Sequence, residues 1–186
     1  ATGGRGLTRT GRMRSLVQNI MAGIVGLQLA VPLAAGDALG APKRLGTFGT
    51  WDGYVFTVKK STVCYLHAVP RTAKGKYAKR GDTFVQVTHR PPKAKGEVGI
   101  TAGYTYKKES EVEVEIDGRK FELFTENDTA WSRDAKGDAA LVKAMRAGRT
   151  MVVHGTSSRS TLTTDTYSLG GFTAGYAAIS KACGIK

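Results

Sequence analysis

Cysteine, proline and long apolar runs are all scarce in this chain of 186 residues. It contains two cysteines and five prolines, while its 24 glycines and its aromatic residues are spread along the sequence. This composition excludes a collagen-like, coiled-coil or fully disordered protein. A chain of this length with 41% hydrophobic residues buries one core rather than two.

The short motifs of common enzymes are also missing. No C-x-x-C or H-x-x-x-H pair offers closely spaced metal ligands, and no G-x-S-x-G turn or phosphate-binding glycine loop is present. Cys64 and His67 are three residues apart on a predicted strand, which places them on opposite faces and argues against a Cys–His dyad. We therefore expect no catalytic residues, no metal ion and no cofactor. Ordinary surface or core positions are expected for the three histidines, His67, His89 and His154.

Acidic residues are few relative to basic ones. The chain has 28 Lys and Arg against 15 Asp and Glu, a formal net charge of +13. Outside residues 1–41 the excess lies between residues 43 and 95, which hold 12 basic side chains and two aspartates, whereas residues 96–186 hold 12 of each sign. This imbalance favours an acidic partner such as nucleic acid, an anionic glycan or a lipid surface.

The basic side chains cluster in two connections between predicted strands. The anion-binding candidates are Arg71, Lys74, Lys76, Lys79, Arg80, Arg90, Lys93 and Lys95. Connections one strand apart leave an antiparallel sheet at opposite ends, so they form one patch only if the sheet curls or the first loop folds back. The alternative interpretation is a solubilising surface. Because Tyr77 is the one aromatic side chain within the first run, we expect no specific nucleic-acid binding.

Residues 1–41 differ in kind from the rest. Four arginines precede a weakly polar apolar stretch at 16–35, which ends in small residues at 34–38. This order predicts an upstream extension and a secretory signal peptide, with cleavage between residues 36 and 41. Polar residues within the stretch make it a poor membrane span, and a retained anchor is the alternative. Residues 42–186 are then expected to form a single exported domain.

Alternation at period two predicts short antiparallel strands over most of residues 42–186. It is clearest at 111–116, where Asp117-Gly118 predicts a tight hairpin that returns through 119–123. The glutamates of this hairpin are expected to pair with Arg119 or Lys120 as a solvated ladder rather than an active site. Further strands are expected at 48–58, 62–69, 83–89, 97–102, 150–158 and 161–168.

Two short helices, at about 134–147 and 171–183, interrupt the strands. The apolar stripe expected on the first comprises Ala135, Ala139, Val142 and Met145, with Gly148 as a stop residue. The inward face expected on the second comprises Phe172, Tyr176, Ile179 and Cys183. The expected fold class is mainly β, an antiparallel β-sandwich or barrel-like domain with two helices.

The two cysteines, Cys64 and Cys183, lie in patterns that predict buried positions. An even cysteine count in an exported chain points to one disulfide bond. Such a bond would attach the last helix to an early strand, and two buried free thiols are the alternative.

Two further segments permit either a structural or a binding role. Arg80-Gly81-Asp82 is an integrin-type tripeptide, but it is also ordinary turn chemistry before a strand, which we favour. Residues 163–168 are rich in hydroxyl groups, and Ser168 is a candidate cap for the last helix. A polar groove for a glycan is the alternative for this segment.

Nine segments carry a resemblance to known proteins: THRP (88–91), GY (103–104), IDG (116–118), FELFT (121–125), AW (130–131), VKAMRAG (142–148), VVHGTS (152–157), TTDTYSL (163–169) and KAC (181–183). In this collinear order they resemble the invasion-associated locus B family, small exported proteins of alphaproteobacteria. The resemblance implies a mainly β domain behind a signal peptide, in the periplasm or cell envelope. It also implies that Cys64 and Cys183 occupy the family's two cysteine positions, and it supplies no catalytic residues.

We therefore expect a non-enzymatic, exported protein of the periplasm or cell envelope, or one exposed at the surface or secreted. Its expected partner is an anionic glycan, lipopolysaccharide or a host-cell surface, with envelope proteins as further candidates. One alternative is a periplasmic hydrolase that uses some of His67, His89, His154 and Asp165. Another is a lipid-binding, small-ligand-binding or chaperone-like module that uses the interior of the sheet.

Overall fold

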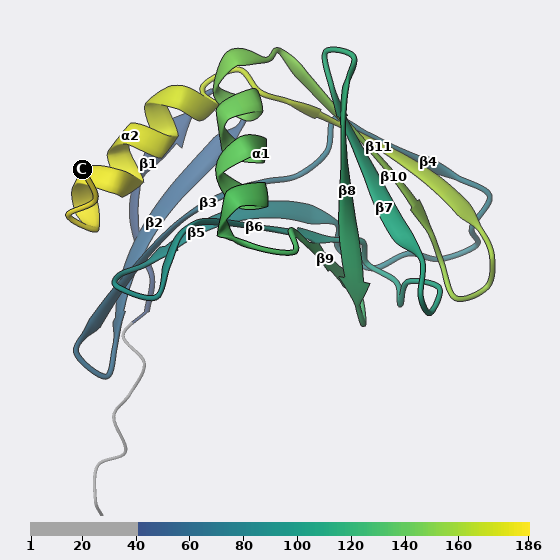
Figure 1. The fold of residues 1–186 in the computed structure, drawn as a ribbon, viewed down its shortest axis with the longest axis horizontal. Helices are drawn as coiled ribbons and strands as arrows, with labels where there is room; N and C mark the ends of the chain where they lie inside the picture. Colours follow the sequence, from purple (N-terminus) through teal and green to yellow (C-terminus); the bar gives the residue numbers. More distant parts are fainter. Residues whose placement is uncertain (1–40) are drawn as a thin grey trace, which may run out of the picture. The chain divides into compact units, whose positions relative to one another are not determined.

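The computed structural model describes residues 41–186, in which one antiparallel sheet carries two helices (Figure 1). The strands are β1 (Lys43–Phe48), β2 (Trp51–Val58), β3 (Ser61–Ala68), β4 (Thr72–Gly75), β5 (Phe84–Arg90), β6 (Ala94–Thr101), β7 (Glu111–Ile116), β8 (Arg119–Glu126), β9 (Thr129–Trp131), β10 (Thr150–Thr156) and β11 (Leu162–Ser168). The helices are α1 (Ala135–Ala147) and α2 (Phe172–Ala182). Neither helix is long and apolar enough to cross a membrane. The predicted signal peptide lies outside the described residues.

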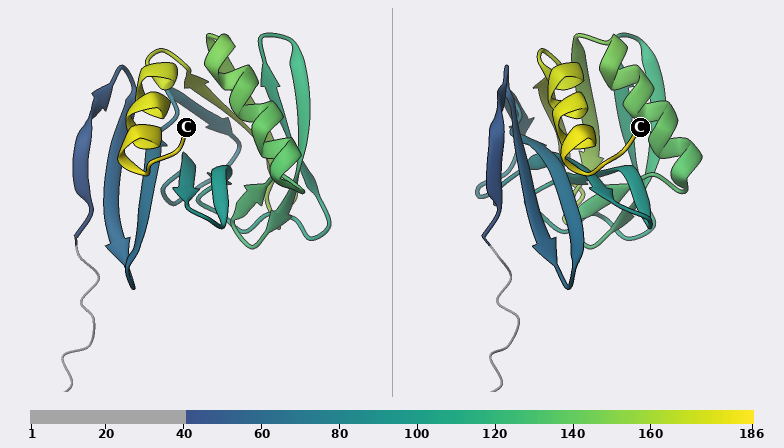
Figure 2. Two further views of the ribbon diagram at one scale, coloured as in Figure 1. Left: turned by 60° about the vertical axis from the view of Figure 1, so that its left-hand side comes forward. Right: turned by 90° about the vertical axis from the view of Figure 1, so that its left-hand side faces the viewer.

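The strands follow one another across the sheet in the order β1-β2-β3-β5-β6-β9-β8-β7-β10-β11-β4. The short strand β4 departs from the sequence order, because the chain leaves β3, pairs β4 with β11 at the far edge, and returns to β5 beside β3. Only residues 69–71 separate β3 from β4, so the sheet curves until its β4 edge lies near the end of β3 (Figure 2). The mainly antiparallel β class with two helices is confirmed, and the sheet remains open rather than closing into a barrel.

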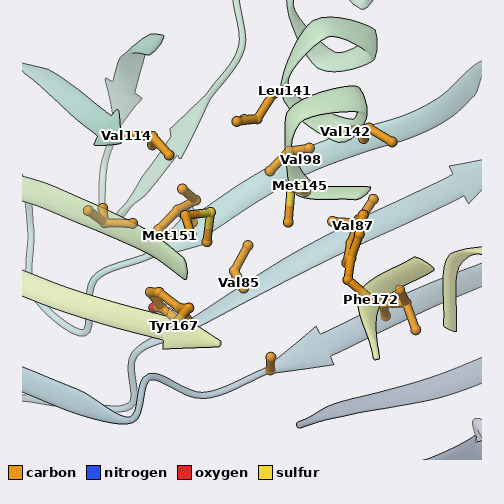
Figure 3. Packing of buried hydrophobic residues seen from close by; sticks show 14 of the residues in the cluster. Val85, Val87, Val98, Val114, Leu141, Val142, Met145, Met151, Tyr167 and Phe172 are labelled. Atoms are coloured by element: carbon orange, nitrogen blue, oxygen red, sulfur yellow. The ribbon is translucent and has the colours of Figure 1, made fainter. Parts of the chain in front are cut away.

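A single core fills the concave side of the sheet. Inward side chains of β5 and β6, such as Val85 and Val98, share one cluster with Met151 of β10 and Tyr167 of β11 (Figure 3). Both helices add to this cluster, α1 through Met145 and α2 through residues such as Phe172. Burial of these apolar surfaces is the main stabilising contribution to the curved shape.

The predicted hairpin is present between β7 and β8. Asp117 and Gly118 both have positive φ angles, 46° and 86°, as a two-residue turn of this type requires. The expected solvated ladder is also observed, since Lys120 pairs with Glu113 across the strands. The Asp117 carboxylate accepts hydrogen bonds from the backbone N–H groups of the chain entering β10, which ties the hairpin to its neighbour.

Two details of the helices differ from the sequence analysis. The buried face of α1 comprises Leu141, Val142, Ala144 and Met145, while Ala135 and Ala139 of the predicted stripe are exposed. Burial of the larger Leu141 and Met145 side chains removes more apolar surface from water than burial of alanine, so these residues decide which face of α1 is turned to the core. Ser168 does not cap α2. Its Oγ accepts from the N–H of Gly170, and Gly171 with φ 92° occupies the cap position.

Helix α2 is fastened to the sheet by the predicted disulfide bond. Cys64 of β3 and Cys183 at the end of α2 are joined, with the two residues 119 positions apart in sequence. Cys64 is fully buried. The helix also packs closely on the strands, because a Cβ on Gly175 would lie 2.8 Å from the side chain of Leu66.

Replacing both Cys64 and Cys183 with alanine is expected to lower the free energy of unfolding by about 4–5 kcal/mol, because the bond closes a very long loop. Guanidinium denaturation of the oxidised protein and of the double variant measures the difference. Reduction of the wild type provides a second comparison in which no side chain is lost. A midpoint that is the same in all three samples would contradict a stabilising role for the bond.

Candidate functional site

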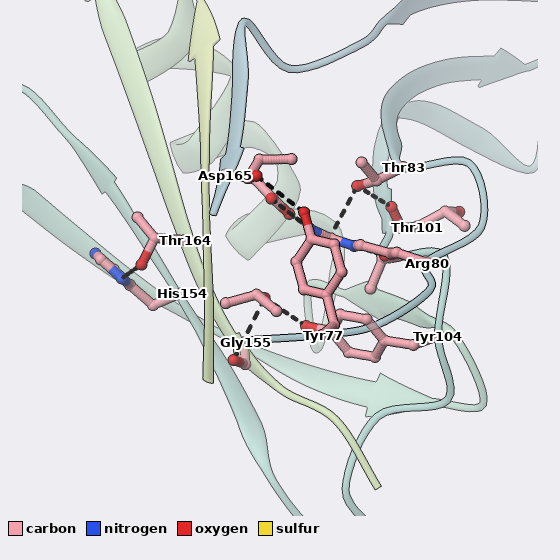
Figure 4. Close-up of polar contacts among 12 residues, drawn as sticks. Tyr77, Arg80, Thr83, Thr101, Tyr104, His154, Gly155, Thr164 and Asp165 are labelled. Carbon is pink, nitrogen blue, oxygen red and sulfur yellow. Dashed lines mark hydrogen bonds and ion pairs between the residues drawn. The ribbon is translucent and has the colours of Figure 1, made fainter. Parts of the chain in front are cut away.

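A buried ion pair lies where the chain returns from β4 to β5. The Arg80 guanidinium donates to both carboxylate oxygens of Asp165 on β11, at 2.7 and 2.6 Å, and its Nε donates to the carbonyl of Ala102 at 2.6 Å (Figure 4). The two side chains are 5% and 4% exposed. Burial disfavours the charged guanidinium, but the hydrogen bonds and the attraction of Asp165 outweigh it, so the pKa of Arg80 is raised above its ordinary value.

Tyrosine rings surround this ion pair. The guanidinium carbon of Arg80 lies 5.5 Å from the ring centroid of Tyr77 and 5.0 Å from that of Tyr104, both within cation–π range. The Tyr77 hydroxyl donates to the carbonyl of Ala73 in β4, and the Tyr104 hydroxyl lies 2.6 Å from Thr163 Oγ1. The return segment is therefore held in place at several points.

This geometry changes the assignment of two predicted site residues. Arg80 is one of the predicted anion-binding residues, but its charge is paired with Asp165 inside the protein and each of its three nitrogens donates to a protein oxygen. Asp165 was a candidate for a hydrolase, and both of its oxygens accept from Arg80. In the Arg-Gly-Asp tripeptide, the Gly81 N–H donates to the Gly103 carbonyl, a backbone contact so close that a Cβ on Gly103 would lie 2.4 Å from the Gly81 oxygen.

Next to the ion pair is a surface cleft of about 570 Å³. Its side chains come from the return segment, from the chain after β6 and from the β10–β11 turn, and they include Lys76, Tyr77, Lys79, Tyr104, Thr105, Ser157, Ser158, Arg159, Thr161 and Thr163. The three cations at its border, Lys76, Lys79 and Arg159, are exposed and form no ion pair within residues 41–186. The cleft therefore combines cations, hydroxyl groups and tyrosine rings.

The remaining basic candidates lie elsewhere. Arg71 precedes the edge strand β4 and Lys74 belongs to it, and this strand pairs with β11 next to Thr163 of the cleft. Arg90, Lys93 and Lys95 lie at the opposite end of β5, where Arg90 pairs with Glu97 and Lys95 Nζ donates to the carbonyl of Lys186. The eight candidates therefore fall into two separate groups. Arg159, which the sequence analysis missed, joins the first group through the pairing of β11 with β4, which no local pattern reveals.

The three histidines occupy separate positions. His67 lies on the outer face of β3 with its ring 5.0 Å from that of Phe84, while His89 is fully buried against α2 and His154 lies on β10. Cys64 and His67 lie on opposite faces of β3, as their spacing predicted. Burial lowers the pKa of His67, with a smaller opposing effect of Asp52.

One cluster of potential metal ligands occurs among the described residues. Atoms of Glu113, Glu115 and His154 lie within 4.8 Å of one another on adjacent strands. Lys120 Nζ, however, lies 3.1 Å from both oxygens of Glu113 and already neutralises it. His154 Nδ1 lies 3.2 Å from Thr164 Oγ1, so Glu113 and His154 each have a partner within the sheet.

The tyrosines near the ion pair are poor general bases. Burial raises the pKa of Tyr104, Tyr106 and Tyr167, so all three hydroxyls are protonated at neutral pH. Of the residues named for a hydrolase, Asp165 is held by Arg80 and His89 is enclosed by Gly96 and Ser180.

Replacing Asp165 with Asn is expected to lower the free energy of unfolding by about 3–5 kcal/mol, because Arg80 is left charged and buried without its partner. The Arg80→Met, Asp165→Leu double variant is expected to lose less than either single variant. Lys120→Gln, which breaks an exposed ion pair, is the matched control and is expected to change stability by at most about 1 kcal/mol. Equal effects of D165N and K120Q in urea denaturation would overturn the assignment.

His89 is expected to make stability depend on pH. The Gly96 N–H donates to Nδ1, so the ring is neutral, and burial, followed by the charge of Lys95, lowers its pKa to about 4. At pH values between about 4 and 6.5, His89 is protonated in the unfolded chain but stays neutral in the folded protein. Stability from this group is therefore complete above pH 6.5 and is lost as the pH falls toward 4, with a slope approaching about 1.4 kcal/mol per pH unit.

Denaturation curves at pH 4.5 to 7.5 for the wild type and for His89→Gln measure this contribution. The difference in unfolding free energy between them is expected to shrink as the pH falls. His67→Gln serves as the control for a second histidine with a lowered pKa. Parallel curves for wild type and H89Q would exclude the buried neutral histidine as the cause.

Comparison with known proteins agrees with this fold. The sequence matches the family described as Invasion associated locus B (IalB) protein over residues 51–180. The crystal structure of invasion associated protein B from Bartonella henselae is similar in fold, with a TM-score of 0.52 and 17% identity over 74% of this chain and 96% of that chain. A search of the curated proteins finds no match. The chain belongs to the invasion associated locus B family.

Proposed function

We propose that this protein is an exported, non-enzymatic protein of the cell envelope that binds an anionic glycan through the cleft beside Arg80 and Asp165. The observation that carries the proposal is the border of the cleft, where Lys76, Lys79 and Arg159 are exposed beside hydroxyl groups. Cations of this kind bind sulfate, phosphate or carboxylate groups, and the hydroxyls bind sugar hydroxyls.

The aromatic lining favours a glycan over a bare anion. Tyr77 is 36% exposed and borders the same cleft, so one part of its ring is accessible to the apolar face of a sugar. Its position is fixed by the hydrogen bond to Ala73 and by the cation–π contact with Arg80. A ring that is already fixed lowers the entropic cost of binding a flexible chain.

Three observations support export to the envelope. The order of arginines, apolar stretch and small residues in 1–41 is that of a signal peptide. The disulfide bond between Cys64 and Cys183 is stable in an oxidising compartment. Membership of the invasion associated locus B family agrees with both, and the name of the Bartonella protein associates that relative with invasion.

A binding role is favoured over catalysis because the cleft lacks a suitable acid–base pair among its described side chains. Its lining contains lysines, arginines, tyrosines, serines and threonines, and the nearest carboxylate, Asp165, is held by Arg80. General acid–base catalysis needs a group that titrates near the working pH within reach of the substrate.

The proposal predicts salt-sensitive binding. Binding of heparin oligosaccharides to the oxidised protein, measured by isothermal titration calorimetry, is expected to weaken by at least about tenfold between low and high salt. Replacing Lys76, Lys79 and Arg159 with Gln is expected to abolish it, whereas the same change at three exposed helix lysines, Lys136, Lys143 and Lys181, is the matched control. Neutral dextran tests for charge-independent binding, and a parallel titration with lipopolysaccharide identifies the source of the glycan. Equal losses in the two triple variants would contradict a site at the cleft.

A further inference from the structure

The outer face of β2 and β3 has an unusual composition. In an open antiparallel sheet the face opposite the core is normally polar, and the glutamates of β7 follow this rule. On β2 and β3, by contrast, the outward side chains include Tyr54, Phe56 and Val58, followed by Val63 and Tyr65. The neighbouring outward side chains of β5, Gln86 and Thr88, are polar. Helix α2 packs on the other face, against Gly53 and Leu66. Such a departure from the alternating pattern marks interaction sites more often than structural ones.

These outward residues form a hollow rather than a flat patch. Phe56 is paired with Val63, and Tyr65 with Thr88, so the four side chains lie in adjacent rows. Val63 and Thr88 are only 8% and 3% exposed. The hollow has a volume of about 650 Å³, within the range of sites for small molecules. Its floor is therefore apolar and aromatic along β2 and β3, through Phe56, Val63 and Tyr65, and polar along β5, where Gln86 donates to the Thr88 hydroxyl.

Cations stand at one border of this hollow. Lys59 in the β2–β3 turn and Arg90 and Lys93 in the β5–β6 turn line it together with Pro91 and Pro92. Both turns are at the same end of the sheet, because the strands between them are antiparallel. Arg90 pairs with Glu97, while Lys59 and Lys93 form no ion pair within the part of the chain that the structure describes. The hollow thus has an apolar floor and a positive end.

The β2–β3 turn carries lysines at positions where other residues fit better. Lys59 and Lys60 have φ angles of 45° and 67°, the left-handed region in which Asn-Gly is strongly preferred. Two lysines at these positions cost stability relative to Asn-Gly. A sequence that keeps charges in an unfavourable backbone conformation is consistent with a use for those charges.

We propose that this hollow binds one molecule of an anionic amphiphile, with its acyl chain on the floor formed by Phe56, Val63 and Tyr65 and its anionic head between Lys59 and Lys93. Charge complementarity selects the head, since the lining residues contain three cations and no carboxylate. A neutral or cationic ligand would make no favourable electrostatic contact with the cations at the border of the hollow. A small anion without an apolar chain would leave the apolar floor exposed to water. The site is separate from the cleft beside Arg80, from which it differs in residues and in ligand class.

Three probes of defined chemistry test the two halves of the site. Dodecyl phosphate, below its critical micelle concentration, carries both the chain and the anionic head. Dodecylphosphocholine keeps the chain with a zwitterionic head, and inorganic phosphate keeps the head alone. Dodecyl phosphate is expected to bind the wild type at least about tenfold more tightly than either of the others. Equal binding of the two dodecyl compounds, equal binding of phosphate, or no binding at all would each overturn the proposal.

The strained turn supplies a variant that separates binding from folding. Lys59→Asn with Lys60→Gly is expected to raise or preserve thermal stability, because Asn-Gly favours this turn. The same variant is expected to bind dodecyl phosphate at least about fivefold more weakly, because the charge near the head group is lost. Lys107→Gln with Lys108→Gln removes two charges elsewhere and is expected to leave binding unchanged. Phe56→Thr keeps a residue that favours β-strands. It is expected to weaken the binding of dodecyl phosphate and to leave the binding of heparin unchanged. Unchanged binding in K59N/K60G, or equal weakening in both lysine pairs, would exclude this position of the head group.

Discussion

The ion pair between Arg80 and Asp165 is the constraint on which the remaining architecture depends. It joins the segment returning from β4 to the strand with which β4 pairs, at the point where the chain passes between the two ends of the sheet. A bidentate guanidinium–carboxylate pair fixes orientation as well as distance, and here the Ala102 carbonyl adds a third contact. Because the pair is buried, loss of either partner leaves an unpaired charge inside the protein and destabilises the fold. The apolar core stabilises the curvature of the open sheet, and this polar contact fixes the path by which the chain returns from its edge.

The same contact explains why a cleft lies on the surface above it. The Arg80 side chain turns inward, and its neighbours Lys76 and Lys79 then remain on the outside of a segment that cannot move freely. Tyr77 and Tyr104 pack beside the guanidinium and form part of the wall. One arginine of the basic run therefore has a structural role, which positions the others for binding. The sequence does not distinguish the structural role from the binding role, because a Lys or Arg in a polar loop can have either.

Much of the fold follows from local patterns, whereas the site does not. The Asp117-Gly118 hairpin, the two helices and the link from Cys64 to Cys183 rest on periodicity, turn chemistry and cysteine count, and all are present. The pairing of β4 with β11, the burial of Arg80 and the approach of Arg159 to the cleft depend on contacts between residues far apart in sequence. The exposed Ala135 and Ala139 show the same limit, because the sheet beneath α1 decides which of its apolar residues are buried.

The path of β4 also has a consequence for the order of folding. Strand β4 is made early, but its partner β11 and the second cysteine lie near the end of the chain. Until those last residues are available, the segment between β3 and β5 has no strand to pair with and Arg80 has no counter-ion. Contacts of such long sequence separation form slowly, because the entropy of closing the intervening loop is lost before they contribute. The native arrangement is therefore completed only after β11 and the end of α2 are available, so the segment from β4 to β5 is among the last parts of the domain to reach its final position.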